Sequence, residues 1–190
     1  VKYKGAKLLL VNPRQTELTP FAHLWLRPRL GTDVALINGL AKVIIDERLL
    51  DEEFVARQTD NFDELGRNLK AYTPERVAEM TGVRSHDVQQ AARLFTGRER
   101  ASIVYGNGIT QHVTGTDSVM ALANLAMLTD NIGHWGGGIF ALQRENNAQG
   151  ACDMGSLPDF LPGYQALDDA EAKKNFEERW GVCLPTNAGL

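Results

Sequence analysis

Polar residues follow the first apolar run of the sequence, where a ligand-binding strand would end. The run covers residues 6–12 and is closed by Pro13, so it is too short for a helix and fits a strand buried on both faces. Asn12, Arg14 and Thr16 offer hydrogen-bonding groups there, and an arginine can pair with a phosphate as a planar fork. Open α/β sheets bind ligands at the carboxyl ends of strands. A nucleotide contact and a solvated turn both explain this stretch.

A second predicted strand ends in the sequence YGNGITQH, residues 105–112. Gly106 and Gly108 would let the backbone approach a ligand, and Asn107 and Gln111 add neutral hydrogen-bonding groups. The stretch lacks the last glycine of GxGxxG and the Gly-Lys-Ser/Thr of a phosphate-binding P-loop. An ordinary tight turn is the alternative, and the two glycines alone favour it.

A third stretch, RLGTDV, places Gly31, Thr32 and Asp33 at the start of a helical pattern that extends to residue 50. Thr32 or Asp33 can cap this helix, which is the more common use of such residues. A carboxylate at the same place can also accept both N–H groups of a guanine edge. Capping and guanine recognition therefore stay open for Asp33.

The most irregular stretch is QRENNAQGACDMG, residues 143–155. It places adjacent asparagines, an arginine–glutamate pair and a cysteine between apolar segments, without a helical or strand period. A segment of this kind rarely serves packing alone. The simplest structural interpretation is that Arg144 and Glu145 pair with each other.

Composition excludes several classes of protein. The 190 residues carry a net charge of −4 with scattered Lys and Arg, which argues against nucleic-acid binding. The 2 cysteines and 4 histidines lack the number and spacing of a disulfide framework or a protein-built metal site. The sequence has no signal peptide and no apolar run long enough to span a membrane. Its ends indicate a piece cut from a longer chain, so targeting signals are expected to be missing.

The elements that would position these residues alternate between strands and helices. Strands are predicted at residues 6–12, 23–27 and 101–105, and helices with caps at Asp51, Thr73 and Ser85 lie between the second and third. This order predicts an α/β fold with a mainly parallel sheet.

Together these stretches resemble the catalytic subunit of molybdenum- or tungsten-dependent formate dehydrogenases, in the molybdopterin oxidoreductase superfamily. The resemblance covers essentially the whole chain and includes VNPRQTE, GTDVAL, YTPERVAEMTGV, GNGITQHVTG and GGGIFALQRENNAQGACDMGSLPDFLPGYQ. It implies a Rossmann-like dinucleotide-binding domain with flanking helices over residues 1–145, which would bind molybdopterin guanine dinucleotide. Residues 146–190 would begin the following domain and leave it incomplete.

The resemblance also implies roles for individual residues. The guanosine end of the cofactor would be bound by Asn12, Pro13, Arg14, Thr16, Gly31, Thr32, Asp33, Gly106, Asn107, Gly108 and Gln111. Asn12 stands where the family usually has aspartate, and RPRLGTD is longer than the usual Arg-Pro-Gly-Thr-Asp. Many formate dehydrogenases have Arg-Gly-Gln before the paired asparagines, and that arginine orients the formate carboxylate. Gln143, Arg144 and Glu145 fill those positions here, so either Gln143 or Arg144 occupies the catalytic arginine position.

For the parent protein, the resemblance implies oxidation of formate to carbon dioxide, or the reverse, with formate and electron-transfer subunits as partners. The metal ligand (cysteine or selenocysteine) and a [4Fe-4S] cluster would lie outside this sequence, so the chain alone is expected to be inactive. We expect a cytoplasmic protein without nucleic-acid or membrane contacts, and a periplasmic parent stays open. The alternatives are a molybdopterin oxidoreductase with another substrate and a non-catalytic nucleotide-binding module.

Overall fold

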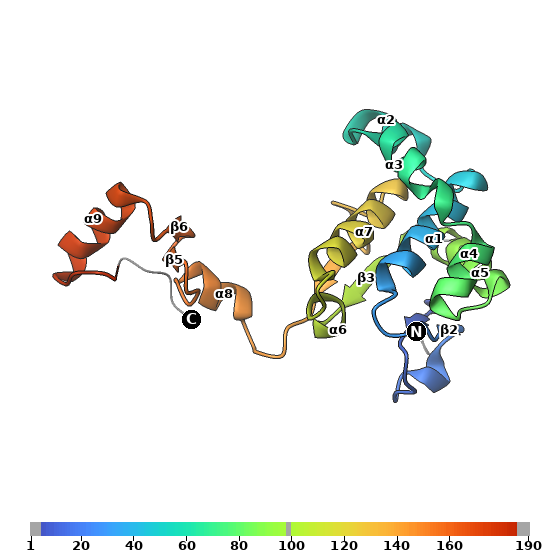
Figure 1. The fold of residues 1–190 in the computed structure, drawn as a ribbon, viewed down its shortest axis with the longest axis horizontal. Helices are drawn as coiled ribbons and strands as arrows, with labels where there is room; N and C mark the ends of the chain where they lie inside the picture. Colours follow the sequence, from blue (N-terminus) through green and yellow to red (C-terminus); the bar gives the residue numbers. More distant parts are fainter. Residues whose placement is uncertain (1–4, 98–99, 186–190) are drawn as a thin grey trace. The chain divides into compact units, whose positions relative to one another are not determined.

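The computed structural model describes residues 5–97 and 100–185, which belong to two compact units, Val1–Leu142 and Gln143–Leu190 (Figure 1). The first unit contains both helices and parallel strands, so the predicted α/β class is confirmed. None of the described helices is long and apolar enough to cross a membrane.

The strands of the first unit form two parallel pairs. β1 (Leu9–Val11) pairs with β2 (Leu24–Leu26), and β3 (Ser102–Tyr105) pairs with β4 (Gly138–Ala141). Within the described residues, no strand joins these pairs into one continuous sheet. The parallel arrangement agrees with the sequence, whereas the Rossmann-like classification stays a prediction.

The helices of the first unit begin close to where the sequence predicts them. They are α1 (Asp33–Asp46), α2 (Glu52–Gln58), α3 (Phe62–Asn68), α4 (Pro74–Thr81), α5 (Ser85–Thr96), α6 (Asn107–Thr110) and α7 (Gly115–Leu128), with short 3-10 turns η1 (Thr19–Phe21) and η2 (Leu69–Ala71). The Asp51 side chain caps α2 by accepting the Phe54 N–H at 2.8 Å, and Thr73 caps α4. The cap predicted at Ser85 is wrong by one residue, since Ser85 is already helical and Arg84 precedes it.

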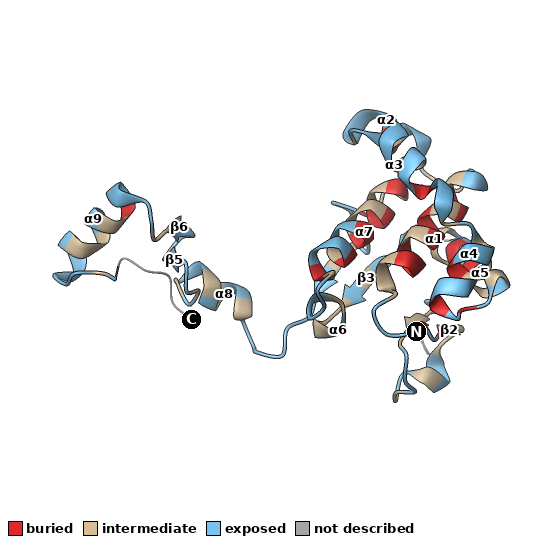
Figure 2. Cartoon of the chain, viewed as in Figure 1, coloured by how far each residue is buried: buried red, intermediate tan, exposed pale blue. Residues whose placement is uncertain are grey.

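One hydrophobic core holds this unit together (Figure 2). α1 lies at its centre and packs against α4, α5 and α7 with the buried side chains of Leu36, Leu40 and Ile44. Ile103 of β3 and Leu9 of β1 pack against the same core, so both strand pairs rest on one helical layer.

The second unit is smaller and has little interior. It contains α8 (Ala148–Asp153), the short antiparallel pair β5 (Phe160–Leu161) and β6 (Gln165–Ala166), and α9 (Ala170–Trp180). Leu161 and Ala172 are the buried apolar residues among those described in this unit. Local contacts hold its pieces, as where the Asp169 carboxylate caps α9.

Candidate cofactor-binding site

The first loop of the candidate site follows β1 and lies beside the end of β2. Asn12 donates its N–H to the Leu26 carbonyl at 3.1 Å, and its own carbonyl accepts the Trp25 indole N–H at 2.9 Å. Its side-chain oxygen accepts the Arg14 N–H at 3.0 Å, which makes a tight turn. The Asn12 carboxamide oxygen is thus engaged by the turn, and its amide nitrogen has no hydrogen bond to the described residues.

Two side chains of this loop lack partners in the described part of the chain. Arg14 is exposed, and its guanidinium makes no hydrogen bond or ion pair there. The Thr16 hydroxyl is buried without a hydrogen-bond partner, although the Thr16 N–H is bonded to the Thr19 hydroxyl at 2.9 Å. An unpaired buried hydroxyl costs about 1–3 kcal/mol, so such groups in native proteins usually meet a partner outside the chain.

Arg27 follows β2 directly and was not singled out from the sequence. Its guanidinium lies 4.8 Å from the centre of the Trp25 ring, a cation–π contact, and the residue is exposed. Because β1 and β2 are parallel, Arg14 and Arg27 both follow strands at the same edge. The position of Arg27 after an apolar run and before Pro28 is the sequence signal that could have identified this residue.

The loop from β2 to α1 is anchored to the end of α4. Arg29 donates its N–H to the Thr81 carbonyl at 2.8 Å, and its guanidinium donates to the carbonyls of Glu79 and Met80 at 2.7 and 3.4 Å. The side chain therefore satisfies carbonyls that the last turn of a helix leaves unpaired. Arg29, which makes these contacts, belongs to the part of RPRLGTD that is longer than the usual Arg-Pro-Gly-Thr-Asp.

The same loop then turns sharply into α1. Gly31 has φ of +77°, and the N–H and hydroxyl of Thr32 both donate to the Arg29 carbonyl, at 3.3 and 2.7 Å. Thr32 occupies the N-cap position, but its hydroxyl is used in the turn and does not cap the helix. The glycine is required here because a positive φ is strained for other residues.

Asp33 is the first residue of α1 and is half-buried. Its carboxylate makes no hydrogen bond or ion pair with any residue that the structure describes, and it is not a side-chain cap. The amino end of a helix favours a negative charge. Of the two uses that the sequence left open, capping is absent and the carboxylate oxygens are available as acceptors.

The loop after β3 contains one helical turn, α6, where the sequence suggested a glycine-containing loop. Gly106 precedes it in extended conformation, and its carbonyl accepts the Ile109 N–H at 3.0 Å. A Cβ at Gly108 would meet no heavy atom within 4 Å, and one at Gly106 would meet only the Leu142 carbonyl oxygen, at 3.5 Å. Neither glycine is required by the described packing, which leaves open backbone beside the exposed Gln111 and the half-buried Asn107.

Gly115 shows the opposite case. A Cβ there would clash with the Thr110 carbonyl, because α6 folds back on the amino end of α7. In the motif GNGITQHVTG, the last glycine therefore serves packing. The packing of the described residues does not require a glycine at position 106 or 108.

Gln143 and Arg144 begin the second unit and are both exposed. Within the described chain, neither side chain makes a hydrogen bond, and Arg144 forms no ion pair with Glu145. Asn147 follows with φ of +53° at the start of α8, and a Cβ at Gly150 would lie 2.6 Å from both polar atoms of its carboxamide. The simple pairing of Arg144 with Glu145 is thus absent, and the approach of Arg144 to a substrate stays a prediction.

The remaining polar side chains of the described residues do not gather into a metal site. The described residues contain no group of three or more His, Cys, Asp or Glu side chains placed to hold a metal ion. In the second unit, burial and the neighbouring Cys152 and Asp153 raise the pKa of the Tyr164 phenol. This shift stabilises the neutral phenol and assigns no chemistry to Cys152.

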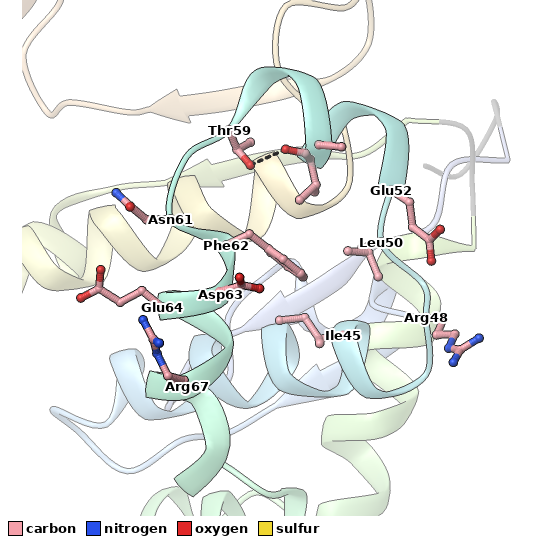
Figure 3. A pocket seen from close by; sticks show the side chains of 12 residues that line it. Ile45, Arg48, Leu50, Glu52, Thr59, Asn61, Phe62, Asp63, Glu64 and Arg67 are labelled. Carbon is pink, nitrogen blue, oxygen red and sulfur yellow. Dashed lines mark hydrogen bonds between the residues drawn. The ribbon is translucent and has the colours of Figure 1, made fainter.

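An open groove of about 680 Å³ lies away from the strand ends, between the end of α1 and the helices α2 and α3 (Figure 3). Its walls combine apolar Leu50 and Phe62 with charges of both signs, Arg48, Glu52 and Arg67. None of the residues predicted to bind the cofactor lines it.

Comparison with known proteins decides the family. The family model for molybdopterin oxidoreductase matches residues 1–181. The chain belongs to the molybdopterin oxidoreductase family. This family membership implies a molybdopterin cofactor with molybdenum or tungsten in the parent protein.

Relatives within the molybdopterin oxidoreductase family include formate dehydrogenase subunits. The chain is 45% identical over 189 residues to the F420-dependent formate dehydrogenase subunit alpha of Methanocaldococcus jannaschii, covering 100% of this chain and 28% of that protein. It is 41% identical to formate dehydrogenase H of Escherichia coli, covering 99% of this chain and 26% of that protein. The chain therefore spans little more than a quarter of these relatives.

One solved structure is also similar to this chain. Acetylene hydratase from Pelobacter acetylenicus matches 70% of this chain and 18% of its own, with a TM-score of 0.67 and 32% identity. The mixed α/β arrangement is thus shared with acetylene hydratase.

Proposed function

We propose that this chain is the part of a formate dehydrogenase catalytic subunit that binds the guanosine end of a molybdopterin guanine dinucleotide. The observation that carries the proposal is a set of polar groups without partners among the described residues: Arg14 and Thr16 in the loop after β1, and Asp33 at the start of α1. Strand ends are where open α/β folds bind nucleotides. A buried orphan hydroxyl and an unpaired half-buried carboxylate fit a ligand with both donors and acceptors.

Each part of such a ligand has suitable groups in the chain. Arg14 and Arg27 follow neighbouring parallel strands and would bind the pyrophosphate, since guanidinium forks match phosphate oxygens. Asp33 would accept hydrogen bonds from the guanine edge. The open backbone at Gly106 and Gly108 would allow close approach of the cofactor. The bound cofactor would supply the two-electron redox chemistry, while these residues of the chain would hold its nucleotide end.

Formate is the substrate that the relatives favour, because 45% and 41% identity link the chain to formate dehydrogenase subunits. The fixed planar fork of an arginine suits a small carboxylate. Neither Arg144 nor Gln143 has a partner in the described chain, and the charged fork of Arg144 suits this role better because a neutral amide binds carboxylates more weakly. The isolated chain is expected to be inactive, since it spans about a quarter of its relatives and holds no metal ligand set in its described residues.

The test uses the full-length parent enzyme with formate and a dye acceptor. Arg144→Ala should reduce kcat/KM by about 100-fold, because a charge-assisted bidentate contact is lost. Gln143→Ala is the matched control and should change it little. Equal activity of the Arg144→Ala enzyme and the unmodified enzyme would remove Arg144 from the substrate site, and the reverse pattern would assign the role to Gln143.

A molybdopterin enzyme with another substrate is the second candidate. The similarity to acetylene hydratase and the altered Arg-Gly-Gln pattern before Asn146 and Asn147 favour it. A parent that binds the pterin dinucleotide but does not turn over formate would support this candidate. A parent that binds nucleotide without pterin or metal would instead indicate a non-catalytic module.

A further inference from the structure

In the second unit, the end of α8 lies against the turn between β5 and β6, residues 162–164. The Asp153 carbonyl, at the end of α8, accepts the Gly163 N–H at 2.7 Å. Gly155 follows α8 with φ of +86°, and a Cβ there would lie 2.8 Å from both the Pro162 nitrogen and its ring Cδ. The two segments can approach this closely because position 155 is a glycine.

Tyr164 adds a side-chain contact between the same two segments. Its phenol lies beside Cys152 and Asp153 at the end of α8, and burial together with these two groups raises the pKa of the phenol, which stays a neutral O–H donor. The ring also stands edge-on to the Phe160 ring, with the centroids 5.9 Å apart. Tyr164 has φ of +55°, a strained backbone conformation for a tyrosine, which persists where surrounding contacts fix it.

α8 is too short to hold its own orientation. It has 6 residues, none of them buried, and isolated helices of this length are marginal in water. Leu161, which directly precedes the β5–β6 turn, is buried, so the turn is attached to the interior of this unit. Only residues 145–147 separate Arg144 from the start of α8. The β5–β6 turn therefore holds the helix from which residues 143–147 extend.

We propose that the β5–β6 turn positions Gln143 and Arg144 for the substrate by holding α8 in place, with Gly155 and Tyr164 as the positioning residues. This inference rests on the proposed function, in which one of the two side chains before α8 orients the formate carboxylate. A displacement of about 1 Å in a group that orients a substrate can cost about 100-fold in rate. Gly155 and Tyr164 would not touch the substrate, so their effect on catalysis would pass through α8.

The experiment compares Gly155→Ala with the control Gly181→Ala in the full-length parent. Both glycines follow a helix of the second unit with positive φ, +86° and +67°, so an alanine is strained at both positions. Only the Cβ at position 155 would meet Pro162, whereas a Cβ at position 181 would meet no described heavy atom within 4 Å. Tyr164→Phe is a second test variant that removes only the phenol hydroxyl, and Tyr72→Phe in the first unit is its control.

Amide hydrogen exchange of residues 143–153 measures the order of this segment without a substrate, and kinetics at measured metal content give kcat and KM for formate. We expect both test variants to speed this exchange and to raise KM at least about threefold, because α8 opens more often and the substrate-binding group is misplaced. Both controls should change neither quantity.

Unchanged exchange in the test variants would overturn the proposal. An activity loss that only follows the metal content, with KM unchanged, would also overturn it, because Gly155 and Tyr164 would then serve stability alone. A parent that does not oxidise formate would contradict the proposed function instead, and the exchange of residues 143–153 would still decide whether the β5–β6 turn holds α8. If the Gly155→Ala protein does not accumulate, Tyr164→Phe alone decides the question.

Discussion

Asp33 offers the most direct test of guanine recognition, since its carboxylate stands at the amino end of α1 without a partner among the described residues. Guanine presents two N–H donors on one edge, and inosine lacks the exocyclic amine. A carboxylate that accepts both bonds should therefore distinguish GDP from IDP. Each hydrogen bond to a charged group contributes about 1.5–3 kcal/mol, which corresponds to a factor of about 10 to 150 in Kd.

The assay is calorimetric titration of the cofactor-free parent with GDP and with IDP. The unmodified protein should bind GDP more tightly than IDP by about one such hydrogen bond, a factor of about 10 to 150. Asp33→Ala should weaken GDP binding by at least that factor and should bind the two nucleotides equally, because neither bond can then form. The comparison of GDP with IDP therefore measures the hydrogen bond to the exocyclic amine separately from any general loss of protein stability.

Asp63→Ala is the matched control. Asp63 lies in the first turn of α3, so its removal loses a similar interaction with the helix dipole, about 0.3–1 kcal/mol, at a place far from the strand ends in sequence. It should leave the GDP and IDP affinities unchanged. Preserved discrimination in the Asp33→Ala protein, or an equal effect of Asp63→Ala, would refute guanine recognition by Asp33.

The fold makes two further predictions. Gly39→Ala should lower the free energy of unfolding measured in urea, because the new Cβ would lie 2.7 Å from a Val77 methyl group. The overpacking cost of about 1–3 kcal/mol exceeds the helix-propensity gain of about 1 kcal/mol. Adding Val77→Ala should recover part of the loss, and a Gly39→Ala protein more stable than the unmodified one would contradict the packing. Hydrogen bonds from Arg93 hold the pKa of Glu47 below its ordinary value of 4.5, so this pair stabilises the fold above that pH and ceases to do so as the pH falls through the lowered pKa. Arg93→Met should therefore lower Tm at pH 7 and have little effect in acid, and a Tm difference that persists at low pH would contradict the linkage.

Local signals in the sequence predicted most of the helices. Asp51 and Thr73 cap α2 and α4 as expected, because a cap depends on residues within one turn of it. The boundary at Ser85 was misplaced because the backbone of Arg84, with no side-chain hydrogen bond, takes the cap position. The helical turn α6 was not predicted, because the two glycines in its sequence are more typical of a loop than of a helix.

The candidate site was predicted less completely than the helices. The end of a strand identified Asn12 and the start of a helix identified Asp33. Only the structure shows that the Asn12 oxygen closes a turn while the Asp33 carboxylate has no partner among the described residues. The local sequence marks Arg27 as the end of a strand, but its place beside the loop after β1 depends on the pairing of β1 with β2, which brings together residues distant in sequence. The division into two parallel pairs also results from such long-range pairing.

The central position of α1 has a consequence for synthesis on the ribosome. α1 is made before α7, one of its main packing partners, which follows only after α2 to α6 and β3. At about 5–20 residues per second, several seconds pass before α7 leaves the ribosome. During that interval Leu40, Ile44 and their neighbours lack part of their cover, so the nascent chain offers chaperones an apolar segment that the finished protein hides.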